Sequence, residues 1–564
     1  MRASQLDAFS AAATLPDGFH YQPDVLTVEQ ERQLLEQLAT LRFKASRRRL
    51  SARAPLDLPA PGSRARRMGA QPFHRSTSCV TRLRCEPSED VTRLERWINP
   101  RCEEHGGRSG FRLLPTGLDA FVARGLLIEL AERTLDLQYY IFHADHTGSL
   151  VIDRLIAAAD RGVRVRMLLD DWGTLEKKDE AVAALDAHPN VEIRVFNPYR
   201  HRTGLGRLGE LLTSFTRVNR RMHNKQLIAD TTAVVLGGRN IGDEYFSRGE
   251  LDFQDVDVIA FGPITHQSTD SFTAYWNSPF AVPISKLTTS RLDEAEFTAA
   301  RHKVRDRCNQ LRDSSYARAL TDSDLATDLR AHSLHLHWAE ARIVADPPEK
   351  ITQRAGSRSE TFLGAQISPH ARGARSDLLI VSPYFVPGKE GVAFFGERRR
   401  VGVNVRVLTN SLAATDVWLV HAGYMKYRRP LLAEGVRLYE LRPEAAGMNG
   451  PRRSGIAIGS SRASLHGKTF VFDGTSVFIG SLNLDPRSLE QNTEVGVLVQ
   501  SPELAAEVVR LFDHWASPAL SYEVTTTTAG RLQWTGGFTN EPEAGFWRPL
   551  GAKFFSHLPI DSLI

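Results

Sequence analysis

The chain contains the pattern His-x-Lys-x4-Asp twice, and an asparagine follows each copy at the same distance. Histidine can act as a nucleophile or as a general acid and base near neutral pH. Lysine supplies a compact positive charge for a phosphoryl oxygen, and asparagine can donate a hydrogen bond to it. Two such sets meeting at one phosphate would form a metal-free site for phosphodiester transfer. The residues of the two sets are His223, Lys225, Asp230 and Asn240, and His466, Lys468, Asp473 and Asn483.

Each pattern alternates as expected for a β-strand, in which every second side chain shares a face. His223, Lys225 and Leu227 then point to one side at a strand end, where they can address one ligand. Asp230 and Asp473 fall on the opposite face, so we expect them to be structural partners of backbone or basic groups. A single His-Lys pair is most often a surface accident, but two copies with identical spacing favour a site.

The repeat extends beyond these motifs at a nearly constant offset. Segments predicted as strands recur in the same order, and helical runs at 150–159 and 394–400 follow the first strand of each set. Strand, helix and strand in succession predict an α/β fold of two homologous halves. Each half carries one His-Lys set, so a complete site requires the halves face to face, with the pocket at their junction. The matching strand segments are 135–142 with 377–385, 162–169 with 402–409, and 191–198 with 436–443.

Both motifs resemble those of the phospholipase D superfamily, and the chain from about Arg108 onward is similar to its bacterial cardiolipin synthase branch. The segments 119–121, 138–142 and 160–165 carry this second similarity. The resemblance implies two phospholipase D-like halves, each a mixed β-sheet flanked by helices, packed with pseudo-twofold symmetry. It also implies an enzyme that needs no metal and no cofactor. The superfamily includes phospholipid hydrolases and phosphodiesterase nucleases, which remain alternatives to phosphatidyl transfer.

The resemblance further implies a phosphohistidine intermediate, as in cardiolipin synthesis from phosphatidylglycerol and a second phospholipid. By analogy His223 is the nucleophile and His466 the general acid and base, although the sequence alone also allows the reverse. Relatives often carry a downstream acid that orients each histidine. Glu494 occupies that place in the second half, and Asp255 and Asp257 are the candidates in the first. The residues assigned to the phosphoryl oxygens are Lys225, Lys468, Asn240, Ser481 and Asn483.

The composition fits a folded enzyme of more than one domain, with 564 residues, 42% hydrophobic and 24% charged. No apolar run reaches the length of about 18 residues that a transmembrane helix needs. The N-terminus has no pattern of a secretory signal. An enzyme that uses phospholipid substrates would then work from the membrane surface. We expect a peripheral protein on the cytoplasmic face of the bacterial inner membrane.

Arginines are concentrated before both histidine motifs, interleaved with apolar residues such as Leu208 and Ile456. This mixture suits an anionic lipid surface, although charged segments are often simply solvated loops. The net charge of +5 is small for this length, and no aromatic stacking platform accompanies the arginines, so we expect no nucleic-acid partner. The arginines are Arg200, Arg202, Arg207, Arg217, Arg220 and Arg221, and Arg452, Arg453 and Arg462.

His143, Asp145 and His146 look at first like metal ligands, but no partner cluster with metal-like spacing follows. We expect this segment to cap the strand before it. The four cysteines also lack the spacing of a metal site.

The N-terminal segment differs from the rest of the chain. Residues 18–43 resemble the start of AlkB-type iron/2-oxoglutarate dioxygenases, but no His-x-Asp follows to bind iron, and 44–68 has a disordered composition. We therefore expect an extension without a catalytic role. The predicted domains are 1–105 (extension), 106–287 (first half), 288–345 (helical connector) and 346–564 (second half).

Overall fold

The computed structural model describes the two predicted halves and the chain between them. The dioxygenase-like stretch at 18–43 and the segment at 44–68 lie outside the described residues. The described residues are 91–171, 180–200, 215–246, 251–287, 294–354, 356–443, 462–545 and 547–556.

The first half is a mixed sheet with the strand order β1-β8-β6-β5-β2-β3-β4-β9. β2, β3 and β4 run parallel, and helix α5 (His146–Asp160) is the crossover from β2 to β3. Strands β5, β6 and β8 are buried along their whole length, as expected for a sheet covered on both faces. The strands are β1 (Ser109–Leu114), β2 (Thr134–Tyr139), β3 (Arg164–Asp170), β4 (Val191–Phe196), β5 (Gln226–Ala229), β6 (Ala233–Gly237), β8 (Asp257–Phe261) and β9 (Ala281–Pro283).

The second half repeats this order as β10-β17-β16-β15-β11-β12-β13-β18. Its parallel strands are β11, β12 and β13, with helix α14 (Gly388–Arg400) as the equivalent crossover. The prediction of two homologous α/β halves is therefore confirmed. The strands are β10 (His337–Ala345), β11 (Asp377–Val381), β12 (Asn404–Asn410), β13 (Arg437–Leu441), β15 (Thr469–Phe472), β16 (Ser476–Gly480), β17 (Val495–Gln500) and β18 (Ser521–Thr526).

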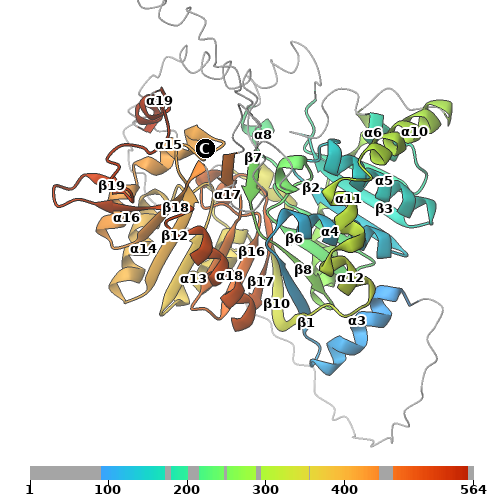
Figure 1. Ribbon diagram of the computed structural model, residues 1–564, viewed down its shortest axis with the longest axis horizontal. Coiled ribbons are helices and arrows are strands. Elements are labelled where there is room, and N and C mark those ends of the chain that lie inside the picture. Colours follow the sequence, from blue (N-terminus) through green and yellow to red (C-terminus); the bar gives the residue numbers. More distant parts are fainter. Residues whose placement is uncertain are drawn as a thin grey trace, which may run out of the picture. The chain divides into compact units, whose positions relative to one another are not determined.

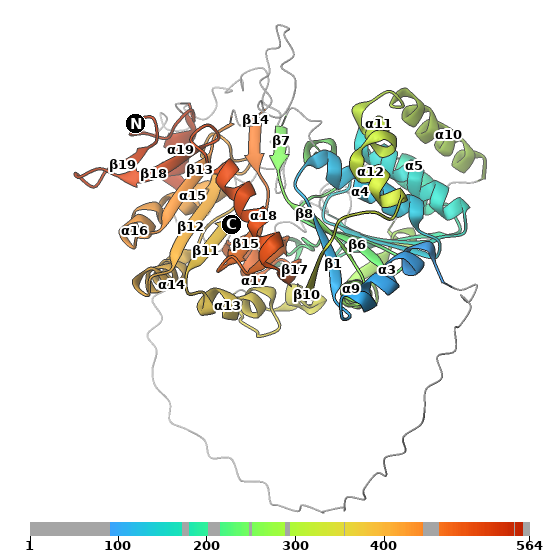
Figure 2. The same cartoon turned by 60° about the horizontal axis from the view of Figure 1, so that its bottom comes forward.

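The two sheets meet through their equivalent first strands. β1 and β10 pair antiparallel, with Gly110 opposite Trp338, and lie side by side between the halves in Figure 2. A hydrophobic core shared by both halves includes Leu236 of β6 and Ile479 of β16, which are equivalent positions. These equivalent strands and core residues meet at the junction and give the pseudo-twofold arrangement implied by the repeat. Figure 1 shows the two halves on either side of β1 and β10.

The expected connector is helical only in part. Helices α10 (Glu294–Gln310), α11 (Ser315–Asp322) and α12 (Asp324–Arg330) occupy its middle. Its last residues form β10, a strand that joins both sheets, so a purely helical connector is wrong. The charged residues Glu340 and Arg342 are exposed on β10, and they make this strand look like part of a solvated helix. Among the described residues, every helix is too short or too polar to cross a bilayer.

The folded first half begins earlier than the predicted boundary at residue 106. Helix α3 (Arg93–Glu104) starts with a capping box in which Thr92 and Glu95 bond each other's backbone N–H groups. Trp97 packs edge-on against Phe261 of β8, with ring centroids 4.9 Å apart. α3 therefore belongs to the core of the first half and not to the extension.

Two truncations should separate the extension from this core. Removing residues 1–90 is expected to leave the rate of catalysis and the free energy of unfolding unchanged. Removing residues 1–104 also deletes Trp97 and its apolar neighbours, and loss of a buried tryptophan alone costs about 3–5 kcal/mol. Urea unfolding of both truncated proteins measures the difference. Equal stability of the two would contradict the placement of α3 in the core.

Candidate active site

Both motif histidines lie at the junction of the halves, and each is tied to the opposite half by its backbone. His223 N–H donates to the Thr493 carbonyl at 2.8 Å, beside a bridge between Met222 and Thr493. His466 N–H donates to the Gln254 carbonyl at 2.8 Å. The residues before His466 form β14 (Arg462–Leu465), which pairs parallel with β7 (Leu251–Gln254) of the first half. Both histidines therefore lie at the junction of the halves, where the repeat predicted a two-histidine site.

Each histidine also takes its carboxylate from the opposite half. Nδ1 of His223 lies 2.9 Å from Oε2 of Glu494, and Nδ1 of His466 lies 2.6 Å from Oδ2 of Asp255. The sequence suggested the reverse arrangement, with each acid serving the histidine of its own half. All four side chains are buried. With Nδ1 donating to a carboxylate, a neutral imidazole carries its lone pair on Nε2, so Nε2 is the reactive nitrogen.

Asp257, the other acid considered for the first half, has a different role. Its carboxylate pairs with the buried guanidinium of Arg124 at 2.8 Å. It also accepts a hydrogen bond from the Arg239 backbone at 3.2 Å. Asp257 therefore has a structural role in the first sheet. Asp255 is the acid of this half that contacts a histidine.

The two carboxylates differ strongly in charge state. Burial alone would raise the pKa of Asp255, but the charge and hydrogen bond of His466, with Lys468 and Arg239, hold it at about 2. Burial raises the pKa of Glu494 to about 7, although Lys225 and Ser481 oppose the rise. Near neutral pH, His466 thus faces the permanent negative charge of Asp255. His223 faces Glu494, whose pKa is close to that pH.

The motif lysines are fixed beside the histidines. Nζ of Lys225 donates to the His223 carbonyl at 2.7 Å, and Nζ of Lys468 donates to the His466 carbonyl at 2.5 Å. Both lysines are fully buried. These contacts hold the positive charge of each lysine beside its histidine.

The motif asparagines are buried with one amide atom uncommitted. Oδ1 of Asn240 accepts a hydrogen bond from Ile141 N–H at 3.1 Å, while its Nδ2 has no partner among the described residues. Oδ1 of Asn483 likewise has no partner in the described part of the chain. Amide atoms left unsatisfied at a buried position are rare in folded proteins. Nδ2 of Asn240 can donate to a phosphoryl oxygen, whereas Oδ1 of Asn483 is an acceptor and needs a donor group opposite it.

Ser481 does not fit the phosphate-binding role expected for it. Its hydroxyl donates to Oε2 of Glu494 at 2.5 Å and accepts from Val495 N–H at 3.0 Å, so its single proton is already used. Gly238 stands at the matching place of the first motif. A Cβ there would lie 2.3 Å from Oδ1 of Asp255, which explains the glycine. Ser481 is better described as a partner that orients Glu494.

The motif aspartates point away from this chemistry. Asp230 accepts hydrogen bonds of 2.7–2.9 Å from the consecutive backbone N–H groups of 132–134. Asp473 accepts equivalent bonds from 375–377. Both residues adopt positive φ, at 50° and 53°, at the turn that ends their strands. This is the backbone-partner arrangement that strand alternation favours.

Asp230→Ala should therefore cost stability and not chemistry. It leaves three partly buried backbone N–H groups without their charged acceptor, and we expect a loss of about 3 kcal/mol in the free energy of unfolding. Asp473→Ala should cost less, because Asp473 is only half-buried. Chemical denaturation and the rate per folded molecule measure both effects. A large loss of rate in a variant that remains fully folded would contradict this role.

Sequence reasoning missed a buried pair that supports Glu494. Oδ2 of Asp346 accepts hydrogen bonds from Glu494 N–H at 2.9 Å and from Nζ of Lys350 at 2.8 Å. Lys350 also donates to the Ser488 carbonyl at 2.9 Å, and its charge lowers the pKa of Glu494. The only signal in the sequence is the spacing of opposite charges four residues apart, which usually marks a solvated helix pair.

Two arginines expected at a lipid surface are instead structural. Arg221 is fully buried, and its guanidinium lies 3.1 Å from Oδ1 of Asp170. Arg220 is also buried and donates to the Ile351 carbonyl at 2.9 Å. The lipid contact predicted for these two is therefore wrong, because strong internal acceptors hold them. Arg202, Arg207, Arg452 and Arg453 lie outside the described residues.

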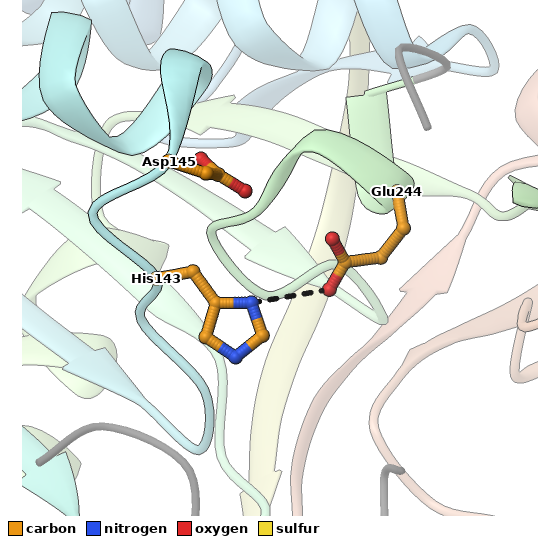
Figure 3. A group of neighbouring side chains, drawn as sticks. All are labelled: His143, Asp145 and Glu244. Atoms are coloured by element: carbon orange, nitrogen blue, oxygen red, sulfur yellow. Dashed lines mark ion pairs between the residues drawn. The ribbon is translucent and has the colours of Figure 1, made fainter. Parts of the chain in front are cut away.

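The loop after β2 forms a compact polar cluster with Glu244, which lies shortly after the first motif (Figure 3). Ligand atoms of His143, Asp145 and Glu244 lie within 4.8 Å of one another. Asp145 caps α5 by accepting from Gly148 N–H at 3.0 Å, and its other oxygen accepts from Asp243 N–H at 2.6 Å. These contacts connect the loop to the helical turn η1 (Asp243–Phe246), so we infer that the cluster holds the loop in place.

A sequence profile described as "Cardiolipin synthase, PLD-like domain" matches the chain twice, at 126–276 and 369–515. The two matches cover one half each and include one histidine motif each. Cardiolipin synthase C of Escherichia coli (strain K12) is 40% identical over 84% of this chain and 100% of its own length. Cardiolipin synthase of Clostridium perfringens (strain SM101 / Type A) is 25% identical over 68% of this chain and 66% of its own.

The fold is also found among solved structures. Phosphatidylserine synthase of Haemophilus influenzae Rd KW20 superposes with a TM-score of 0.51, over 84% of this chain and 99% of that chain. The sequences are 12% identical, so this likeness concerns the fold alone.

Proposed function

The chain belongs to the family described as cardiolipin synthase, PLD-like domain, and from this premise we propose that it is a phosphatidyltransferase that makes cardiolipin. The observation that carries the proposal is the pair of buried histidines, each held by a lysine of its own half and a carboxylate of the other. Two imidazoles fixed at one junction can divide nucleophilic and acid-base work on one phosphodiester.

The reaction has two displacements at one phosphorus. Nε2 of His223 attacks the phosphatidyl donor, and His466 protonates the departing alcohol, which leaves a phosphohistidine. The incoming hydroxyl group then gives its proton to His466 while its oxygen attacks the phosphorus, and the bond to His223 breaks. Lys225, Lys468 and the motif asparagines bind the phosphoryl oxygens in both steps.

The carboxylates support this division of roles. The ionised Asp255 stabilises a protonated imidazole at His466, as a general acid requires. The pKa of Glu494 is raised to about 7, so its charge at His223 is not permanent; its ionised form accepts the Nδ1 proton and leaves the Nε2 lone pair of a neutral imidazole available as nucleophile.

We place this enzyme at a membrane surface, as a peripheral protein on the cytoplasmic face of the bacterial membrane. Its phosphatidyl donor and acceptor both reside in a bilayer, and the relatives named cardiolipin synthase support phospholipids as the substrates.

Expression in a bacterium that lacks cardiolipin, followed by lipid profiling, tests the proposal. The intact chain should restore cardiolipin and His223→Ala should not. Release of glycerol would identify phosphatidylglycerol as donor, and release of ethanolamine would identify phosphatidylethanolamine. Phosphatidic acid alone would indicate hydrolysis, and an unchanged lipid profile would contradict a lipid substrate altogether.

A further inference from the structure

The last described helix, α19 (Trp547–Ser556), packs on the second half through one face only. Ala552 is fully buried, and Phe555 contacts Trp418 of α15 (Trp418–Met425) with ring centroids 5.4 Å apart. These contacts define the inner face of the helix and fix its orientation on the protein.

The outer face of α19 is both apolar and basic. Leu550 is 50% exposed and Phe554 is 65% exposed, one helical turn apart, with Lys553 exposed between them. Across the described residues, only two other large hydrophobic side chains, Val401 and Phe538, are exposed. Arg548 donates to the Leu412 and Ala413 carbonyls at 3.3 Å and therefore faces the protein. Lys553 is exposed and the helix has no carboxylate, so the charge on its outer face complements an anionic surface.

α19 lies at the same edge of the second sheet as the catalytic junction. Helix α15 follows the carboxyl end of β12, where Asn410 exchanges hydrogen bonds with Leu465 at 2.7 and 3.0 Å. Leu465 directly precedes His466. Figure 1 shows α19 and α15 at the same end of the strands as β7, the strand that pairs with the segment before His466.

We infer that α19 is a docking helix that inserts Leu550 and Phe554 into the interface of an anionic phospholipid bilayer. Lys553 then lies at the depth of the lipid phosphates, where a long cationic side chain can reach them. The helix would hold the catalytic junction against the surface that contains its substrates. This inference rests on the proposed function for the identity of the surface, but it concerns binding and not chemistry.

Flotation with vesicles of equal parts phosphatidylglycerol and phosphatidylcholine measures the docking. The double variant Leu550→Asp/Phe554→Asp should bind at least about tenfold more weakly than the intact chain, since two apolar side chains lose their burial. Val401→Asp is the matched control. Val401 is 60% exposed, but it precedes the amino end of β12, at the opposite edge of the sheet, and its replacement should leave binding unchanged.

A water-soluble, short-chain phosphatidylglycerol separates docking from catalysis. The double variant should convert it at the rate of the intact chain, which also shows that the variant is folded. His223→Ala should bind vesicles normally and convert neither substrate. If the intact chain bound vesicles but transferred no phosphatidyl group, the proposed function would be contradicted and the docking role of α19 would still be supported.

Two results would overturn the inference. The first is a double variant that floats with vesicles as well as the intact chain does. The second is sedimentation of the intact chain as a dimer that the double variant cannot form, with vesicle binding unaffected, because the outer face of α19 would then cover a second copy of the chain.

Discussion

His223→Ala is expected to lower phosphatidyl transfer by about five to six orders of magnitude, the loss seen when one member of a coupled nucleophile and base pair is removed. Without the imidazole no phosphohistidine can form, and neither Lys225 nor His466 can replace it, since both are held in place by contacts of their own. Single-turnover assays with a radiolabelled phosphatidyl donor measure both the transfer and the covalent intermediate.

His466→Ala distinguishes nucleophile from acid. A donor with a good leaving group, such as a p-nitrophenyl phosphodiester, needs no proton from the enzyme. With this donor His466→Ala should still release p-nitrophenol once and retain the phosphoryl group, whereas His223→Ala should do neither. If the His223→Ala variant retained the phosphoryl group and the His466→Ala variant did not, the two histidines would have the opposite roles.

Glu494→Gln is expected to lower the rate by about two to four orders of magnitude, the range for a positioned acid-base group. The amide of glutamine can still lie beside Nδ1 of His223, but it has no negative charge. It therefore favours less strongly the tautomer that has its proton on Nδ1 and its lone pair on Nε2. The rate of the first step under single-turnover conditions measures this loss.

The pH dependence tests the same residue more specifically. The pKa of Glu494 is raised to about 7, so the carboxyl group is protonated below that pH and ionised above it. The rate of the intact chain should rise with pH through about 7, and Glu494→Gln should lack this rise. Asp255, held at about 2, stays ionised over the same range. Asp255→Asn should therefore lower the rate and keep the rise near pH 7; a rise that survives in Glu494→Gln would contradict the assignment.

The positions of the two histidine-lysine sets could be predicted from the spacing of residues within the sequence. The spacing of His223 and Lys225 indicates one strand end, and the second copy indicates a partner half. The same repeat predicts the strands β2, β3 and β4 and their counterparts β11, β12 and β13, because these apolar-rich segments recur at a nearly constant offset. β10 was not predicted, because Glu340 and Arg342 interrupt its apolar residues and make the segment resemble the charged helical part of the connector before it.

The acids could not be assigned by the same means. Which carboxylate meets which imidazole depends on how the two halves pack, and spacing within one half contains no information about that contact. Ser481 shows the same limit, since its hydroxyl is directed to Glu494 by the strand pairing of β16 with β17. Asp346 and Lys350 are outside both motifs and become visible only through the buried hydrogen bonds that join Lys350 to Asp346 and Asp346 to Glu494.

The pairing of β1 with β10 has a consequence for the independence of the two halves. Two equivalent strands that pair antiparallel reproduce within one chain the kind of interface that a symmetric dimer has. Because Glu494 and Asp255 each contact the histidine of the opposite half, either half on its own has a histidine without its acid. Neither half expressed alone should therefore have both parts of a histidine-acid pair.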